Sequence, residues 1–204
     1  RRGRRGRRGW RERRRRHDRR RRRAGRHRAQ GRRGHRQRRW QRSDEFSTWL
    51  DQSTLPSLTM EQALVLYRAS SGGKAGEFKT NPIEDVRDSL DFLLFDTIML
   101  EGRFDECAAQ EGAYNLAGTG KEFYSYLLCL RSPALFAVWN SHAERALRRM
   151  EIFPKTLRKG HLGLRYLDLL ESLQPVRQQL GLADFRVVDE FAYALPLPAK
   201  RTGG

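Results

Sequence analysis

Residues 114–147, YNLAGTGKEFYSYLLCLRSPALFAVWNSHAERAL, decide how this chain is expected to fold. The stretch opens with Leu116–Lys121 (LAGTGK), a tight turn that holds two glycines, and continues as an apolar helical pattern. Glycines spaced G-x-G let the backbone approach another backbone, or a phosphate, where a side chain would clash. The helix that follows offers N–H groups and the positive end of its dipole to an anion. We interpret the turn as a candidate clamp for a nucleic-acid backbone.

The apolar pattern after Gly120 predicts a helix that ends at Ser132-Pro133, because proline disfavours helical backbone in the residue before it. Tyr124 and Ser125 are expected to face outward or toward a ligand. The expected buried stripe consists of residues at helical spacing, namely Phe123, Tyr126, Leu127 and Leu130.

The segment Val138–His142 leads into a second helix over residues 143–150. Asn140 or Ser141 is a good N-cap for that helix, which is one interpretation of Asn140, and a ligand contact is the other. His142 is either a packed or capping histidine or a general base. The helix carries the one basic face expected in the folded part, either simply solvated or beside a DNA site: Arg145, Arg148 and Arg149.

Together, the turn and the Val138–His142 segment resemble the helix-hairpin-helix DNA glycosylase superfamily. Leu116–Gly120 is similar to its L-P-G-[VI]-G hairpin, and Val138–His142 is similar to its V-D-[ST]-H segment, with one extra residue before the acid position. Asn140 falls 22 positions after Gly118, which is the family's usual spacing. The resemblance implies an all-α, helix-hairpin-helix glycosylase-like fold that binds double-stranded DNA. It implies phosphate contacts at Gly118, Thr119, Gly120, Lys121, Arg145, Arg148 and Arg149, and base contacts at Tyr124, Trp139 and His142.

The departures from that family bear on catalysis. Asn140 stands where the family has its catalytic Asp, and Glu122 stands where bifunctional members have a nucleophilic lysine. An amide cannot accept a proton or balance the positive charge that develops at the sugar, a loss that costs on the order of a thousandfold in rate. We therefore expect a DNA-binding or base-reading module that does not excise the base. The alternatives are a weak monofunctional glycosylase that uses Glu122 or Glu144, and a protein-interaction domain whose G-x-G is only a tight turn.

A second, less specific resemblance is to helical modules that accompany McrB-type AAA+ ATPases in modification-dependent restriction systems. It implies a partner ATPase or nuclease. Two runs of residues carry it: Leu127, Leu130, Pro133, Phe136, Val138, Trp139 and Asn140 in the first, and Asp184, Phe185, Val188, Asp189 and Phe191 in the second.

The charge of the chain is divided very unevenly. The 204 residues have a formal net charge of +18. Residues 1–42 hold 24 Arg against one Asp and one Glu, or +22, whereas residues 43–204 hold 18 Lys and Arg against 22 Asp and Glu, or −4. So many like charges predict that residues 1–42 form a disordered arm. The rest of the chain is expected to form a helical domain over 43–198 and a tail over 199–204. The arm is interpreted as a nucleic-acid-binding segment, a solvated tail, or an upstream region translated outside its natural start.

Elsewhere, apolar residues at helical spacing predict further helices, about seven in all, and no strand pattern occurs. The first, over 59–70, has Thr59 and Gln62 as a capping box, and the second runs over 82–100 until Glu101-Gly102 breaks it. Pro175 is expected to kink or restart a helix that begins at 164 and runs to 180. The remaining two are expected over 103–109 and 184–195.

Several classes of site and location are disfavoured. The two cysteines, Cys107 and Cys129, lie far apart without a C-x-x-C partner, which predicts buried thiols in a reducing cytoplasm rather than a disulfide or zinc site. No cofactor or metal is expected, and no apolar run approaches the length of a membrane span. The chain begins with Arg rather than Met, and we expect it to be a fragment of a longer reading frame.

Overall fold

A computed structural model describes residues 34–158 and 160–195 of the protein. Within these ranges the secondary structure is helical and includes no strand, which confirms the all-α prediction. Helical residues 34–39 come first. The other elements are α2 (Ser43–Trp49), η1 (Leu55–Ser57), α3 (Met60–Ala69), α4 (Ala75–Phe78), α5 (Ile83–Phe95), α6 (Leu100–Ala108), α7 (Lys121–Arg131), α8 (Ser141–Arg149), η2 (Lys155–Arg158), α9 (Leu162–Gln179) and α10 (Phe185–Ala194). None of the helices in the described ranges has the length and apolar character needed to cross a membrane.

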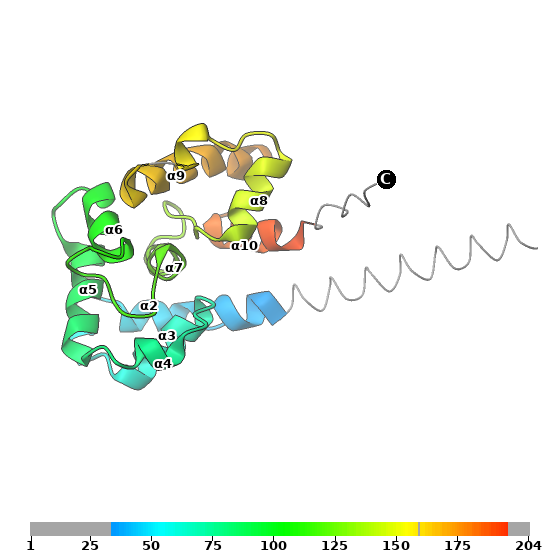
Figure 1. Cartoon of the computed structure of the whole chain (residues 1–204). Helices are drawn as coiled ribbons and strands as arrows, with labels where there is room; N and C mark the ends of the chain where they lie inside the picture. Colours follow the sequence, from blue (N-terminus) through cyan, green and yellow to red (C-terminus); the bar gives the residue numbers. More distant parts are fainter. Residues whose placement is uncertain (1–33, 159, 196–204) are drawn as a thin grey trace, which may run out of the picture.

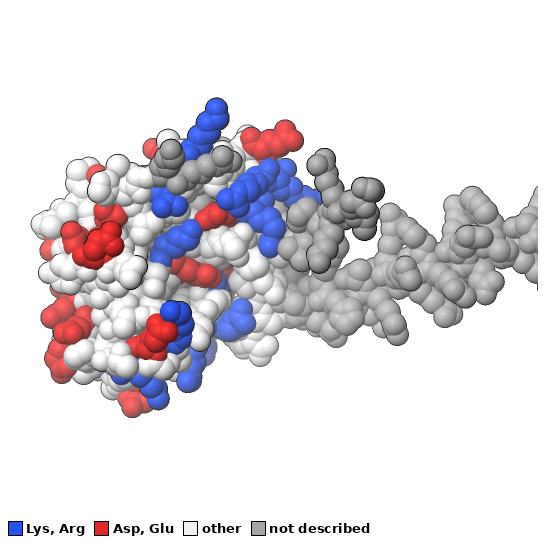
Figure 2. Space-filling view, viewed as in Figure 1, with Lys and Arg blue, Asp and Glu red and all other residues white. Residues whose placement is uncertain are grey.

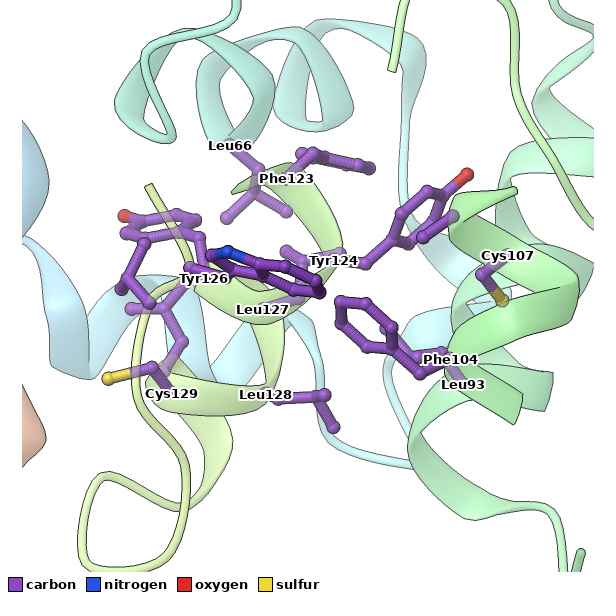
Figure 3. Packing of buried hydrophobic residues seen from close by; sticks show 14 of the residues in the cluster. Leu66, Leu93, Phe104, Cys107, Phe123, Tyr124, Tyr126, Leu127, Leu128 and Cys129 are labelled. Carbon is purple, nitrogen blue, oxygen red and sulfur yellow. The ribbon is translucent and has the colours of Figure 1, made fainter. Parts of the chain in front are cut away.

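Helix α7 lies at the centre of the fold, and the other helices surround it (Figure 1). Eight consecutive residues, from Phe123 to Leu130, are buried, so this helix is covered on every side. Figure 3 shows Leu66 of α3 and Phe104 of α6 among the side chains that pack around it. The expectation that Tyr124 and Ser125 face outward is wrong, because both are fully buried. A prediction of one buried and one exposed face fails for α7, because other helices surround it.

The boundary between α5 and α6 differs from the prediction. Helix α5 ends at Phe95 rather than near residue 100, because the Asp96 carboxylate accepts a hydrogen bond from the N–H of Ile98 (2.8 Å) and turns the chain. Gly102 lies inside α6 instead of breaking a helix. The predicted capping box of Thr59 and Gln62 is confirmed at the start of α3.

Helices α6 and α9 meet at very close range. A Cβ atom at Gly163 would lie 1.8 Å from the carbonyl oxygen of Glu101, so only glycine permits this approach. Asp105 of α6 accepts a hydrogen bond from the N–H of Leu162 (2.7 Å) and so caps α9 from another helix. Pro175 lies inside α9, which runs past it to Gln179 instead of restarting there.

The folded part begins earlier than predicted. Residues 34–39 are helical, and His35, Arg39 and Trp40 are buried. The Trp40 ring packs against Tyr126 of α7, with ring centroids 5.2 Å apart. The predicted boundary at 42/43 is therefore wrong, since residues 34–42 belong to the helical domain. Residues 1–33 of the predicted arm and the tail 199–204 lie outside the described residues.

Candidate nucleic-acid interface

The glycine turn before α7 is held in place by its neighbours. Asn81 accepts a hydrogen bond from the N–H of Ala117 (2.9 Å), and the Tyr67 hydroxyl donates to the Gly118 carbonyl (2.7 Å). Gly118 has φ +78°, and a Cβ there would lie 3.0 Å from the backbone nitrogen of Phe78. Where a side chain would stand, Gly118 therefore faces α4, and glycine permits this close contact within the fold. Its contact to a phosphate stays a prediction.

Gly120 is the part of the turn that remains open. A Cβ atom there would meet nothing within 4 Å. Gly120 is the N-cap of α7 and supplies no capping side chain, so the first N–H groups of the helix are not capped by it. Thr119 is half-buried, and its hydroxyl donates to the Leu116 carbonyl (2.6 Å). An anion would thus approach this turn at Gly120 and Lys121.

The two stretches that the sequence singled out lie together in space. The Lys121 ammonium donates to Oε1 of Glu144 in α8 (2.7 Å) and lies 4.2 Å from the centroid of the Trp139 ring. The indole N–H of Trp139 donates to the same Glu144 oxygen (3.0 Å), and its backbone N–H donates to Ser125 of α7 (2.8 Å). The start of α7 and the start of α8 therefore form one surface region.

Two of the three residues predicted to contact a nucleobase are inaccessible. Tyr124 and Trp139 have no exposed surface. The Tyr124 hydroxyl accepts a hydrogen bond from the N–H of Leu116 (3.1 Å), and burial raises the pKa of this phenol to about 12. Trp139 is stacked in the core with Phe104 and Tyr166. Stacking on an extruded base would require the core to open, so both assignments are corrected to core positions.

Asn140 is the N-cap of α8, as one of its two interpretations predicted. Its side-chain oxygen accepts hydrogen bonds from the N–H groups of His142 (3.0 Å) and Ala143 (2.8 Å). Its amide nitrogen donates to Asp189 of α10 (2.9 Å). Asn140 is 2% exposed, and both the oxygen and the nitrogen of its amide form hydrogen bonds inside the protein.

Asp189 is the centre of a buried polar cluster that the sequence analysis did not assign. Besides Asn140, it accepts hydrogen bonds from His35 (2.7 Å), Trp40 (3.1 Å) and Arg39 (3.4 Å). Burial by itself raises the pKa of this carboxyl, but the hydrogen bond from His35 and the charge of Arg39 outweigh it, so the pKa lies below its ordinary value. The cluster ties residues 34–42 to α8 and α10.

Arg39 connects this cluster to α7. It is 1% exposed, and its guanidinium donates to the Ser70 carbonyl (3.0 Å) and contacts the carboxylate of Glu122. Glu122, which occupies the lysine position of the resemblance, is therefore paired with a cation. The Tyr126 hydroxyl closes the link by donating to the Arg39 carbonyl (2.8 Å).

His142 lies at the edge of the same cluster. Its ring is 4.8 Å from that of Tyr193, which stacks on His35 at 4.0 Å. Burial, followed by the charge of Arg145, lowers the pKa of His142. The imidazole is then neutral near pH 7, and its Nδ1 accepts from the Arg145 guanidinium. A general-base role stays a prediction.

Helix α8 carries the cations of the predicted basic face. Figure 2 shows Lys and Arg gathered over α8 and the turn after it, toward the upper right of the view. Arg148 and Arg149 are exposed, and Arg145 is half-buried. Arg148 donates to Oε2 of Glu144 (3.1 Å) and lies over the Phe153 ring (4.1 Å).

Comparison with known proteins gives no relative. No protein-family model matches the sequence, and no significant match is found among curated proteins or solved structures. The two resemblances therefore rest on the residues quoted for them. Within the described residues, no group of three or more His, Cys, Asp and Glu is arranged to hold a metal ion.

Proposed function

We propose that this protein binds double-stranded DNA through a basic face formed by the start of α7, by α8 and by the turn after α8. The basic face is defined by Lys121, Arg145, Arg148, Arg149 and Lys155. The observation that carries the proposal is a concentration of charge. Residues 141–165 hold seven Lys and Arg against two Glu, or +5, whereas all of residues 34–195 hold 20 against 22, or −2. The rest of the folded part is thus −7 in total, and the net positive charge of residues 141–165 suits a polyanion.

Local geometry supports the same surface. Lys121 and the open backbone at Gly120 lie at the positive end of the α7 dipole, next to α8 through the Lys121–Glu144 ion pair. Backbone N–H groups and cations at a helix start are typical phosphate contacts, which position a protein on DNA without reading its sequence. The proposal therefore assigns the phosphodiester backbone, rather than a base, to this face.

We further propose that binding occurs without base excision. A glycosylase needs a carboxylate beside the scissile bond. Asn140 is an amide engaged in capping, Glu122 is paired with Arg39, and Glu144 is paired with Lys121. The second resemblance adds a partner ATPase or nuclease of a restriction system, which would supply the chemistry that this chain leaves out.

The test measures duplex affinity of residues 34–204 against salt concentration. Starting at residue 34 keeps the buried Arg39 and Trp40 and removes most of the arginine-rich arm, whose charge would otherwise mask the basic face. The affinity falls as salt rises, and each lost phosphate contact makes the slope of log K against log salt shallower by about 0.9. The double variant Arg148→Ala, Arg149→Ala should therefore make this slope shallower by about 2. Arg131→Ala removes one cation at the opposite end of α7 and serves as the control, with an unchanged slope expected.

Failure to bind duplex at low salt, or equal slopes in all three proteins, would refute the proposal. Circular dichroism melts of each variant confirm that the fold is retained. An assay for abasic sites on modified duplexes accompanies the titration. No product is expected, and accumulation of abasic sites would instead establish the glycosylase alternative.

A further inference from the structure

The carboxylate of Glu144 collects donors from three separate positions. Its Oε1 accepts from the Lys121 ammonium (2.7 Å) and the Trp139 indole N–H (3.0 Å), and its Oε2 accepts from Arg148 (3.1 Å). Lys121 begins α7, Trp139 directly precedes the N-cap of α8, and Arg148 lies one turn after Glu144 on α8. Two cations and one neutral N–H thus converge on a single anion at the centre of the basic face.

This arrangement differs from the buried Asp189 cluster in its access to solvent. The side chain of Asp189 is 2% exposed, so its partners cannot be reached from outside. The side chain of Glu144 is 20% exposed, and those of its cation partners are 34% for Lys121 and 55% for Arg148. The Glu144 cluster is therefore an anion site with an open rim, whereas the Asp189 cluster is closed.

The donor set matches the chemistry of a phosphodiester. A phosphate oxygen is bound by charge-assisted hydrogen bonds from Lys and Arg, as a carboxylate oxygen is. Burial raises the pKa of Glu144, but the hydrogen bond and charge of Lys121 more than offset this, so the pKa lies below its ordinary value and the site holds its anion at neutral pH. A phosphate could replace that anion without changing the charge at the site.

We propose that Glu144 occupies a phosphate site of the basic face in the free protein and that a phosphate of the DNA backbone displaces it. The inference rests on the proposed DNA binding and adds a self-blocking residue to it. Rotation of the Glu144 side chain toward solvent releases Lys121 and Arg148 together, and both then contact the incoming phosphate. The indole N–H of Trp139 exchanges a carboxylate acceptor for a phosphate acceptor, or loses its acceptor.

The first test compares Glu144→Gln with Glu151→Gln in the full chain. Both variants remove one negative charge from the same region, but Glu151 is an exposed residue just beyond α8. Removing the residue that competes with the phosphate should make Glu144→Gln bind duplex about tenfold more tightly at one salt concentration. The salt slope should stay nearly the same, because Lys121 and Arg148 contact phosphate in both complexes. Glu151→Gln should leave the affinity nearly unchanged. An effect of Glu144→Gln no larger than that of Glu151→Gln would overturn the proposal.

The second test reads the site directly in the unsubstituted full chain. The indole N–H resonance of Trp139, assigned by its loss in Trp139→Phe, is followed by NMR as a short duplex is added. It should shift as the bound fraction rises, because its acceptor changes. A stationary Trp139 resonance, while backbone amides of α8 shift at saturation, would show that Glu144 stays in place and would sink this inference alone. If neither the Trp139 resonance nor any amide of α7 and α8 shifts at saturation, the proposed DNA binding at the basic face is removed instead.

Discussion

Replacing Asp189 by alanine should strongly destabilise the protein and detach residues 34–42. Asp189 is 4% exposed and is the shared acceptor for His35, Arg39, Trp40 and Asn140. Alanine removes the carboxylate but leaves these donors buried, including the guanidinium of Arg39. The costly outcome is a set of buried donors without their shared acceptor, while Arg39 keeps only the partly exposed Glu122 as a counter-charge.

The expected magnitude follows from that geometry. Breaking a buried ion pair by removing one partner costs about 3–5 kcal/mol, and a chain of this size loses about 2–4 °C in Tm per kcal/mol. Asp189→Ala should therefore lower Tm by about 6–20 °C. The control is Asp88→Ala, which removes an exposed carboxylate from α5 and should change stability by less than about 0.5 kcal/mol.

Urea unfolding of both variants gives the free energies, and limited trypsin digestion reports the local effect. Cleavage at Arg39 and Arg42 should be slow in the unsubstituted protein and fast in Asp189→Ala. Equal stability of Asp189→Ala and Asp88→Ala, or equal cleavage before and after the substitution, would refute the role assigned to this cluster.

The pKa of Asp189 also predicts how the stability of the protein depends on pH. The pKa of Asp189 in the folded protein lies below its ordinary value, so its contribution to stability is fully present above the unfolded pKa, about 3.9. That contribution is lost as pH falls through the folded pKa. The stability gap between the unsubstituted protein and Asp189→Ala should therefore be constant near neutrality and narrow only in acid below about pH 4. A stability difference between the two proteins that widened in acid would contradict the pairing of the Asp189 carboxylate with its donors.

Three further substitutions test the close contacts of the fold, each by urea unfolding. Gly118→Ala should cost about 1–3 kcal/mol, because it forces a Cβ into a left-handed backbone against α4. Asn140→Asp keeps the cap of α8 but places a second carboxylate against Asp189. It should lower the free energy of unfolding by about 1–3 kcal/mol at pH 7. This loss should shrink in acid, as one of the two carboxyls is protonated. Gly163→Ala should cost at least about 2 kcal/mol, because its Cβ would collide with the Glu101 carbonyl and push α6 from α9.

Elements with local signals were predictable from the sequence. The capping box of Thr59 and Gln62 and the N-cap at Asn140 depend on residues within one turn of each other, and both form as expected. The proximity of the glycine turn to α8, which the Lys121–Glu144 pair establishes, was implicit in the resemblance rather than in any local pattern.

Burial around α7 was not predictable from periodicity. Tyr124 and Ser125 carry hydroxyls and fall off the apolar stripe, yet both are buried, because the loop before α7, α7 itself and Trp139 supply partners for those hydroxyls. The Ser125 hydroxyl donates to the Lys121 carbonyl (2.6 Å) and accepts from the N–H of Trp139 (2.8 Å). Only the tertiary arrangement shows that every side of this helix is covered.

The docked segment 34–42 was missed for a different reason. Its arginine-rich composition predicts disorder, but Arg39 finds counter-charges 83 and 150 positions away, in Glu122 and Asp189. Two weak signals were present. Trp40 is a large aromatic residue in a polar run, and Asp189 interrupts the apolar face that Phe185, Val188 and Ala192 form on α10. Neither signal identifies its partner without the fold.

Hydrogen exchange of the full chain with and without a duplex is the most direct test of the basic face as a DNA-binding surface. Peptides that cover residues 118–122 and 141–151 should exchange more slowly in the complex, while peptides from α5 should be unchanged. Protection confined to residues 1–33, with α7 and α8 exchanging at their free rates, would show that DNA is bound elsewhere and would contradict the account.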